Sequence, residues 1–92
     1  MKTYLMTLFV TGDSPRSERA LHNLIELCDK AMPGNYSLNI IDVLEQPNLA
    51  EEEKIFATPT LIKRTPSPTR RIIGDLSDYN KVLLGLGVTN YE

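Results

Sequence analysis

The chain of 92 residues contains one cysteine, one histidine and no tryptophan. A single cysteine, Cys28, excludes an internal disulfide. Cys28 together with the sole histidine, His22, cannot supply the ligands of a usual structural zinc site, so we predict no metal. Stability must therefore come from the hydrophobic core of one small domain, which we expect to span residues 1–92.

Positive charge is not in excess, since ten Lys and Arg face twelve Asp and Glu for a net charge of −2. This balance argues against nucleic acid as a partner. No apolar run approaches the ~20 residues that cross a bilayer, and residues 1–10 lack the cleavage site of a secretory signal. We expect a cytoplasmic protein that binds neither nucleic acid nor membrane.

Motifs of catalysis and nucleotide binding are missing as well. The chain has no Gly-x-Ser-x-Gly turn, no Gly-x-Gly-x-x-Gly turn and no phosphate-binding loop. His22 and Cys28 are separated by about 240° around a helix, so they do not form a catalytic dyad. Cys28 lies on an apolar helical stripe and is predicted to be buried. We predict a non-enzymatic protein with no catalytic residues and no cofactor.

The pattern of apolar residues, caps and breakers predicts seven elements in the order βαβαββα, an α/β fold. Strands are expected at 3–10, buried on both faces, and at 36–43, parallel to the first. A long helix is expected from near Ser14 to Pro33, and a short solvent-facing helix at 46–54. Two extended segments, 60–63 and 70–73, flank a proline-rich connection, and Ser77 is expected to cap a last helix.

Residues 79–88 fit two secondary structures. Apolar residues at 79, 82, 83 and 86 have helical spacing, whereas those at 82, 84, 86 and 88 alternate as in a strand. Gly85 and Gly87 are each expected to cost a helix about 1 kcal/mol and also to weaken a strand. We therefore predict a bistable segment, decided by packing.

This order of elements resembles the thioredoxin-like fold, in which Pro59 of Thr58-Pro59-Thr60 corresponds to a structural cis-proline. The resemblance places Ser14 and Ser17 at the positions of the redox dithiol of that fold. A hydroxyl cannot form the nucleophile that disulfide exchange needs, so an enzyme of glutaredoxin or glutathione-transferase type is disfavoured.

Four basic residues, Lys63, Arg64, Arg70 and Arg71, flank the proline-rich connection. They are either solubilising charge on an edge strand or a docking patch for an acidic partner surface. The charges alone leave both interpretations open.

Several longer motifs resemble the circadian clock protein KaiB family across nearly the whole chain. They are Phe9-Val10-Thr11-Gly12, Ser14-Pro15-x-Ser17, Arg19-Ala20-Leu21, the runs 41–47 and 49–52, Ala57-Thr58-Pro59-Thr60-Leu61, Arg70-Arg71-Ile72-Ile73-Gly74-Asp75-Leu76-Ser77, and Lys81-Val82-Leu83-x-Gly85-Leu86. The block from Ala57 to Ser77 is the most specific.

The resemblance implies a non-enzymatic regulator that docks on the N-terminal ATPase ring of the KaiC hexamer. It also implies sequestration of KaiA where KaiA is present, contact with clock-output histidine kinases, and partner-binding roles for Arg19, Arg70 and Arg71. It further implies a second, resting fold ordered βαββααβ, as a tetramer or dimer, with the segment containing Gly85 and Gly87 in the region that switches.

Three positions depart from the family pattern. Asn39 stands where the family has lysine, which puts KaiA handling in question, and Gly87 and Asn90 stand where aspartate and tyrosine are expected. The altered C-terminus puts the tetramer in question. A KaiC-linked stress or signalling adaptor without an oscillator therefore stays open beside a clock regulator.

Overall fold

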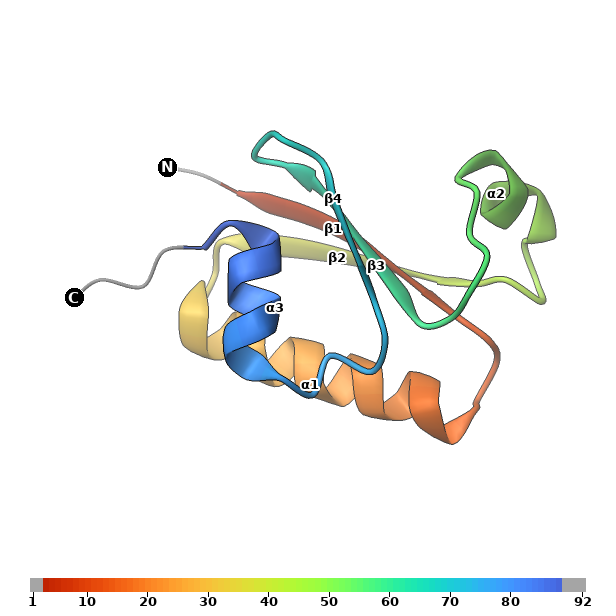
Figure 1. Cartoon of the computed structure of the whole chain (residues 1–92), viewed down its shortest axis with the longest axis horizontal. Helices are drawn as coiled ribbons and strands as arrows, with labels where there is room; N and C mark the ends of the chain where they lie inside the picture. Colours follow the sequence, from red (N-terminus) through yellow and green to blue (C-terminus); the bar gives the residue numbers. More distant parts are fainter. Residues whose placement is uncertain (1–2, 89–92) are drawn as a thin grey trace.

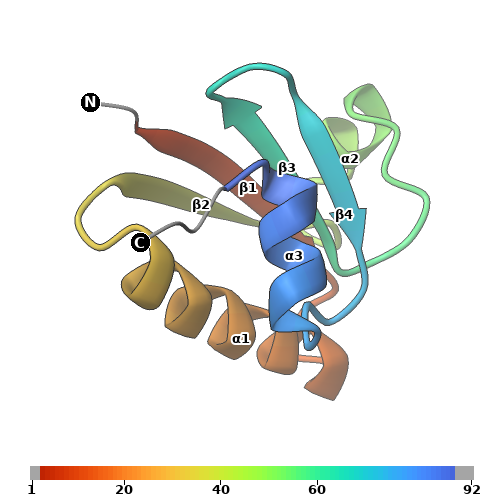
Figure 2. The same cartoon turned by 60° about the vertical axis from the view of Figure 1, so that its left-hand side comes forward.

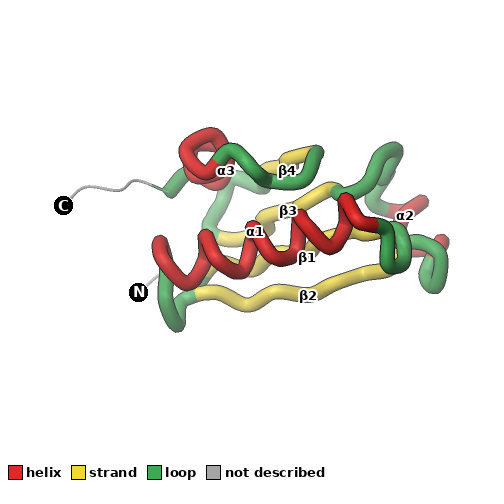
Figure 3. The backbone as a smooth tube through the Cα atoms, turned by 90° about the horizontal axis from the view of Figure 1, so that it is seen from below, coloured by secondary structure: helices red, strands yellow, loops and turns green. Residues whose placement is uncertain are grey.

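The computed structural model describes residues 3–88, and its elements follow the predicted order βαβαββα. They are β1 (Tyr4–Val10), α1 (Pro15–Ala31), β2 (Tyr36–Asp42), α2 (Pro47–Glu52), β3 (Thr60–Thr65), β4 (Arg70–Ile73) and α3 (Tyr79–Leu86). The four strands form one sheet in the order β2-β1-β3-β4 (Figure 3). The predicted βαβ unit is confirmed, because β2 pairs parallel to β1, while β3 and β4 are antiparallel neighbours.

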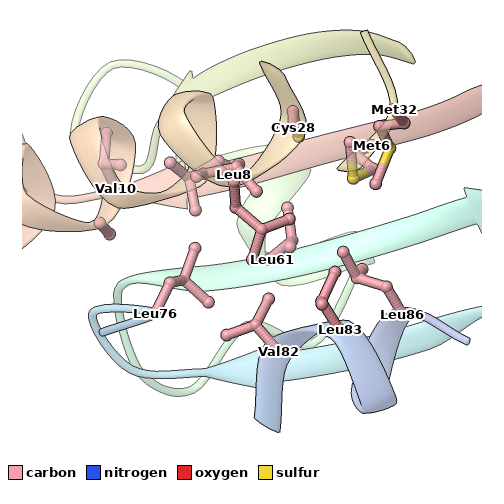
Figure 4. Packing of buried hydrophobic residues seen from close by; sticks show 13 residues of the cluster. Met6, Leu8, Val10, Cys28, Met32, Leu61, Leu76, Val82, Leu83 and Leu86 are labelled. Carbon is pink, nitrogen blue, oxygen red and sulfur yellow. The ribbon is translucent and has the colours of Figure 1, made fainter. Parts of the chain in front are cut away.

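Helices α1 and α3 lie on one face of the sheet, and α2 lies apart from them at one end of the strands (Figures 1 and 2). The main core fills the space between the sheet and the α1–α3 layer (Figure 4). Its residues are Met6, Leu8, Val10, Ala20, Leu24, Leu27, Cys28, Met32, Leu61, Leu76, Val82, Leu83 and Leu86. No helix among residues 3–88 combines the length and apolarity that crossing a bilayer requires.

Helix α1 begins where its sequence predicts. The Ser14 hydroxyl accepts the backbone N–H of Ser17, and Pro15 occupies the first turn, where its missing N–H costs nothing. The helix ends at Ala31, just before the Pro33-Gly34 pair. Ile25, in the middle of this helix, is 40% exposed because it lies outside the buried stripe of Ala20, Leu24, Leu27 and Cys28.

Two other expectations were wrong in part. Strand β1 is not buried on both faces along its length, since Leu5 is 43% exposed and only Phe9 is fully buried on the face away from α1. The cap of α3 is Asp78, whose side chain accepts the N–H of Lys81, and not Ser77. An aspartate directly before the helix competes successfully for this role.

The two glycines of the last segment have different surroundings. Gly85 lies inside α3, where an added Cβ would stand 2.8 Å from Cδ1 of Ile72 on β4. Gly87 follows the helix as its C-cap with φ 76°, and its N–H bonds to the carbonyls of Leu83 and Leu84. The expected cost of Gly87 to the helix is therefore wrong, because a left-handed cap is the position that glycine favours.

Candidate functional site

The basic residues near β4 gather around the end of α2. Arg64 lies 2.9 Å from a Glu53 carboxylate oxygen, and Arg71 lies 3.9 Å from the other. Arg71 also donates to the backbone carbonyl of Glu53 and, at 3.3 Å, to that of Lys54. These contacts fasten the C-terminal end of α2 to the β3–β4 hairpin. Two arginines, Arg64 and Arg71, thus lie beside one carboxylate here.

Lys63 does not belong to this cluster. It is 2% exposed, and its ammonium group donates to the carbonyl of Pro66 at 2.7 Å. Strand alternation places Lys63 on the face of Leu61, which points into the core. The expectation that all four basic side chains share an exposed patch is therefore wrong for Lys63. Its side chain is buried, and its ammonium group hydrogen-bonds to the connection between β3 and β4.

Arg19 lies in a different layer. Its guanidinium is 3.7 Å from Asp75 in the loop before α3, and Asn23 donates to the Asp75 carbonyl at 2.9 Å. Hydrogen bonds from Ser77 lower the pKa of Asp75 against an opposing effect of desolvation, and the nearby Arg19 lowers it further. The three predicted partner-binding arginines thus do not form one cluster, since Arg19 contacts the α3 side and Arg71 contacts α2.

Beside the basic cluster lies an apolar surface that the sequence analysis did not single out. Phe56 is 91% exposed and Ile73 is 67% exposed. A hollow of about 410 Å³ lies between them and is lined by Lys54, Ile55, Phe56, Thr60, Arg71 and Ile73. We call Lys54, Phe56, Arg71 and Ile73 the α2–β4 surface. Arg70 pairs with Lys63 in the ladder and therefore lies on the other face of β4. The adjacent pair Ile72-Ile73 could have indicated the α2–β4 surface, because neighbouring residues of a strand point to opposite faces and cannot both face the core.

Hydroxyl groups occupy the start of α1. The Ser14 hydroxyl donates to the Ser17 hydroxyl at 2.8 Å, and the Ser17 hydroxyl also accepts the N–H of Thr11 at 3.1 Å. The hydroxyls of Thr11 and Thr58 hydrogen-bond to each other, and the following Thr58–Pro59 bond is cis. The cluster joins β1, α1 and the start of β3 without a sulfur atom.

Cys28 is fully buried in the core, as predicted. Burial, with a smaller contribution from Asp29, raises the pKa of the Cys28 thiol to about 12. Among residues 3–88, no three His, Cys, Asp or Glu side chains come together in a way that could hold a metal ion.

We expect Cys28 to react with iodoacetamide at pH 8.5 at well under one hundredth of the rate of an exposed cysteine. A pKa near 12 leaves a thiolate fraction about a thousandfold below that of an ordinary thiol at this pH. Mass spectrometry of the native chain checks this, with unfolded chain as the control. Equal rates in the native and unfolded chains would contradict it. The native chain should also show no disulfide reductase activity.

Two of the three departures from the family pattern can be placed. Asn39 is exposed on β2, the edge strand opposite β4, and Gly87 caps α3. Asn90 lies outside the described residues.

The comparisons with known proteins agree with the fold and the motifs. A family model described as KaiB domain matches residues 7–88. The chain belongs to the KaiB family. It is 59% identical over 85 residues to the circadian clock oscillator protein KaiB of Prochlorococcus marinus strain MIT 9312, covering 92% of this chain and 81% of that protein. It is 56% identical over 91 residues to KaiB of Thermosynechococcus vestitus, covering 99% and 84%.

Solved structures confirm the thioredoxin-like architecture. The N-terminal domain of Synechococcus elongatus SasA matches with a TM-score of 0.77 at 26% identity, covering 100% of this chain and 90% of that one. Mitochondrial thioredoxin 3 of Saccharomyces cerevisiae matches with a TM-score of 0.73 at 19% identity, covering 95% and 79%.

Proposed function

We propose that this chain is a non-enzymatic clock or clock-like regulator that acts in the cytoplasm. It binds the N-terminal ATPase ring of the KaiC hexamer, modulates the KaiC phosphorylation cycle, and sequesters KaiA where KaiA is present. Membership of the KaiB family, whose relatives are circadian clock oscillator proteins, supports the proposal. The observation that carries it in this chain is the α2–β4 surface.

The α2–β4 surface has the composition of a protein-binding site. An aromatic residue and an aliphatic residue stand exposed around a hollow, and cations border them. Binding energy in protein interfaces is concentrated in such apolar anchors and in arginine, while charge orients the approach of the partner. Next to this surface, on the other face of β4, the Arg70 side chain makes no ion pair or hydrogen bond within residues 3–88, so its guanidinium is available to a carboxylate of KaiC.

Arg19 keeps a partner-binding role in this proposal, but at a separate contact. Its side chain is 59% exposed beside Asp75 on the α1–α3 layer. A partner that touches both Arg19 and Arg71 has to reach around the edge of the sheet.

We expect Arg70→Glu to weaken KaiC binding about tenfold, and Arg70→Glu with Arg71→Glu about a hundredfold. Titration calorimetry with KaiC of the same organism, with and without nucleotide, measures the Kd. Arg70→Glu is the cleaner variant, because Arg71→Glu also breaks the link to α2 and faces Glu53. Lys30→Glu with Lys81→Glu, on exposed positions of α1 and α3, is the control for net charge. An unchanged Kd for Arg70→Glu and for the double variant, with unchanged circular dichroism, would show that these charges are solubilising only.

A KaiC-linked adaptor without an oscillator is the second candidate, and Asn39 favours it. An uncharged residue on the exposed edge strand removes a cation with which the family is expected to handle KaiA. Reconstituting KaiC phosphorylation with and without KaiA separates the two candidates. A rhythm that requires this chain supports the clock regulator, and KaiC binding without any rhythm supports the adaptor.

A further inference from the structure

The Glu53 carboxylate occupies a site that two arginines form on the outer face of the β3–β4 hairpin. One of its oxygens lies 2.9 Å from the Arg64 guanidinium, and the other lies 3.9 Å from that of Arg71. Arg71 pairs with Ile62 in the ladder, and Arg64 follows Ile62 by two positions, so the three side chains share one face of the sheet. The main core, which holds Leu61, lies on the other face. Two guanidinium groups side by side favour a carboxylate as their ligand.

The backbone of Glu53, more than its carboxylate, fastens the end of α2 to the hairpin. Arg71 donates hydrogen bonds to the backbone carbonyls of Glu53 and Lys54, and neither bond uses the Glu53 side chain. The side chains of Glu53, Arg64 and Arg71 are 33%, 41% and 42% exposed, so water competes for their ion pairs and these pairs contribute little to stability. The Glu53 carboxylate can therefore leave the arginines while the end of α2 stays in place.

The arginine site adjoins the hollow of the α2–β4 surface. Arg71 belongs to both, because it lines the hollow of about 410 Å³ and also lies beside Glu53. Phe56 and Ile73 belong to the apolar part of that lining. A partner segment whose apolar side chain fills the hollow therefore brings its neighbouring residues close to the arginines. The charge there favours Asp or Glu at those neighbouring positions, but in the free chain Glu53 already occupies the site.

We infer that Glu53 competes internally with the partner, and that docking replaces the Glu53 carboxylate at Arg64 and Arg71 with a carboxylate from an acidic segment of KaiC. The inference rests on the proposed docking of KaiC at the α2–β4 surface. It assigns a chemistry to the docking segment, which carries an apolar side chain for the hollow and an Asp or Glu next to it. Because one carboxylate replaces another, the number of ion pairs stays the same. Glu53 therefore weakens the binding of an acidic partner without preventing it.

The test is Glu53→Gln, which removes the competing charge, keeps the size of the side chain and retains the backbone carbonyl that Arg71 binds. We expect this variant to bind KaiC of the same organism about fivefold more tightly than the native chain does, as measured by titration calorimetry. Loosening of α2 would change the Kd in the opposite direction, because the surface would then have to be ordered on binding.

Glu52→Gln is the matched control for net charge. Glu52 is the preceding residue of α2, is exposed, and makes no ion pair within residues 3–88. Its substitution changes the charge of the chain by the same amount, and we expect the Kd to stay within about twofold of the native value.

Arg64→Gln provides a second arm. Arg64 makes the closer of the two ion pairs of Glu53, so the gain from Glu53→Gln should fall below about twofold when both substitutions are combined. A gain that is undiminished in the combined variant would contradict the exchange of carboxylates at this site.

The remaining outcomes separate the inference from the proposed function. Native chain that binds KaiC, with a Kd for Glu53→Gln that is equal or weaker and with unchanged circular dichroism, would overturn the inference and leave docking in place. Equal gains from Glu53→Gln and Glu52→Gln would also overturn it, because net charge would then explain both. If neither the native chain nor Glu53→Gln bound KaiC, the proposed function would be wrong, and this inference with it.

Discussion

Leu83→Ala is expected to lower the free energy of unfolding by about 3 kcal/mol, and Leu84→Ala by less than about 0.5 kcal/mol. The two residues are neighbours of identical chemistry in α3, but Leu83 is 6% exposed in the core and Leu84 is 77% exposed. In a domain of this size the larger loss lowers Tm by roughly 15 °C. Chemical denaturation of both variants measures the difference.

The pair serves as its own control, because each variant removes the same atoms from the same helix. A loss shared equally by Leu83→Ala and Leu84→Ala would mean that α3 does not pack on the sheet through the face described above. The expected asymmetry follows from Leu83 lying with Val82 and Leu86 on the core side of α3 (Figure 4).

Much of the fold could be predicted because its signals are local. Helix α1 is specified by the Ser14 cap, Pro15 and apolar residues at helical spacing, and the parallel pairing of β1 and β2 follows from the helix between them. These signals act over a few residues each. The predicted bounds of these elements therefore agree with the structure to within one or two positions.

The arrangement of charges could not be predicted in the same way. Arg64 and Arg71 meet at Glu53 only because the hairpin folds back against the end of α2, a tertiary contact with no local signature. Lys63 is different, because its alternation with Leu61 was an available signal for an inward side chain, whereas its charge suggested the surface. The carbonyl of Pro66 compensates for that burial.

The exposed apolar surface was missed for a related reason. Phe56 and Ile73 are of residue types that usually lie in the core. Only the structure shows that both side chains are largely exposed within residues 3–88. Two such residues that adjoin one hollow, rather than standing singly, are the feature on which the proposed partner surface rests.

The second large effect concerns residues 79–88, for which we predict an equilibrium between the thioredoxin-like monomer and the βαββααβ resting form. In the helix Leu83 is buried and Leu84 is exposed, whereas the strand pattern uses Val82, Leu84, Leu86 and Val88. Leu84→Ala should therefore destabilise only the resting form and shift the population to the monomer. Leu83→Ala should shift it the opposite way. Amide NMR spectra and sedimentation over about a hundredfold range of concentration measure both shifts.

Gly85→Ala, the obvious variant by helix propensity, separates the two states less clearly. Alanine favours the helix by about 1 kcal/mol over glycine, but its Cβ would stand 2.8 Å from Cδ1 and 3.1 Å from Cγ1 of Ile72. Ile72 has to rotate, and this cost opposes the gain. We still expect Gly85→Ala to favour the monomer, by less than its propensity suggests.

We expect that the equilibrium can be biased, because the helix buries Leu83 whereas the strand pattern predicts burial of Leu84 in the resting form. One leucine contributes about 2–3 kcal/mol on burial, which is comparable to the gap that separates two accessible states of a protein. Association is expected to stabilise the resting form, and KaiC, which we propose binds the thioredoxin-like monomer, is expected to stabilise the monomer. Opposite shifts are therefore expected from concentrating the chain and from adding KaiC. A single set of amide resonances, unaffected by concentration, by added KaiC and by Leu84→Ala, would show that residues 79–88 have one structure and that their double periodicity is without consequence.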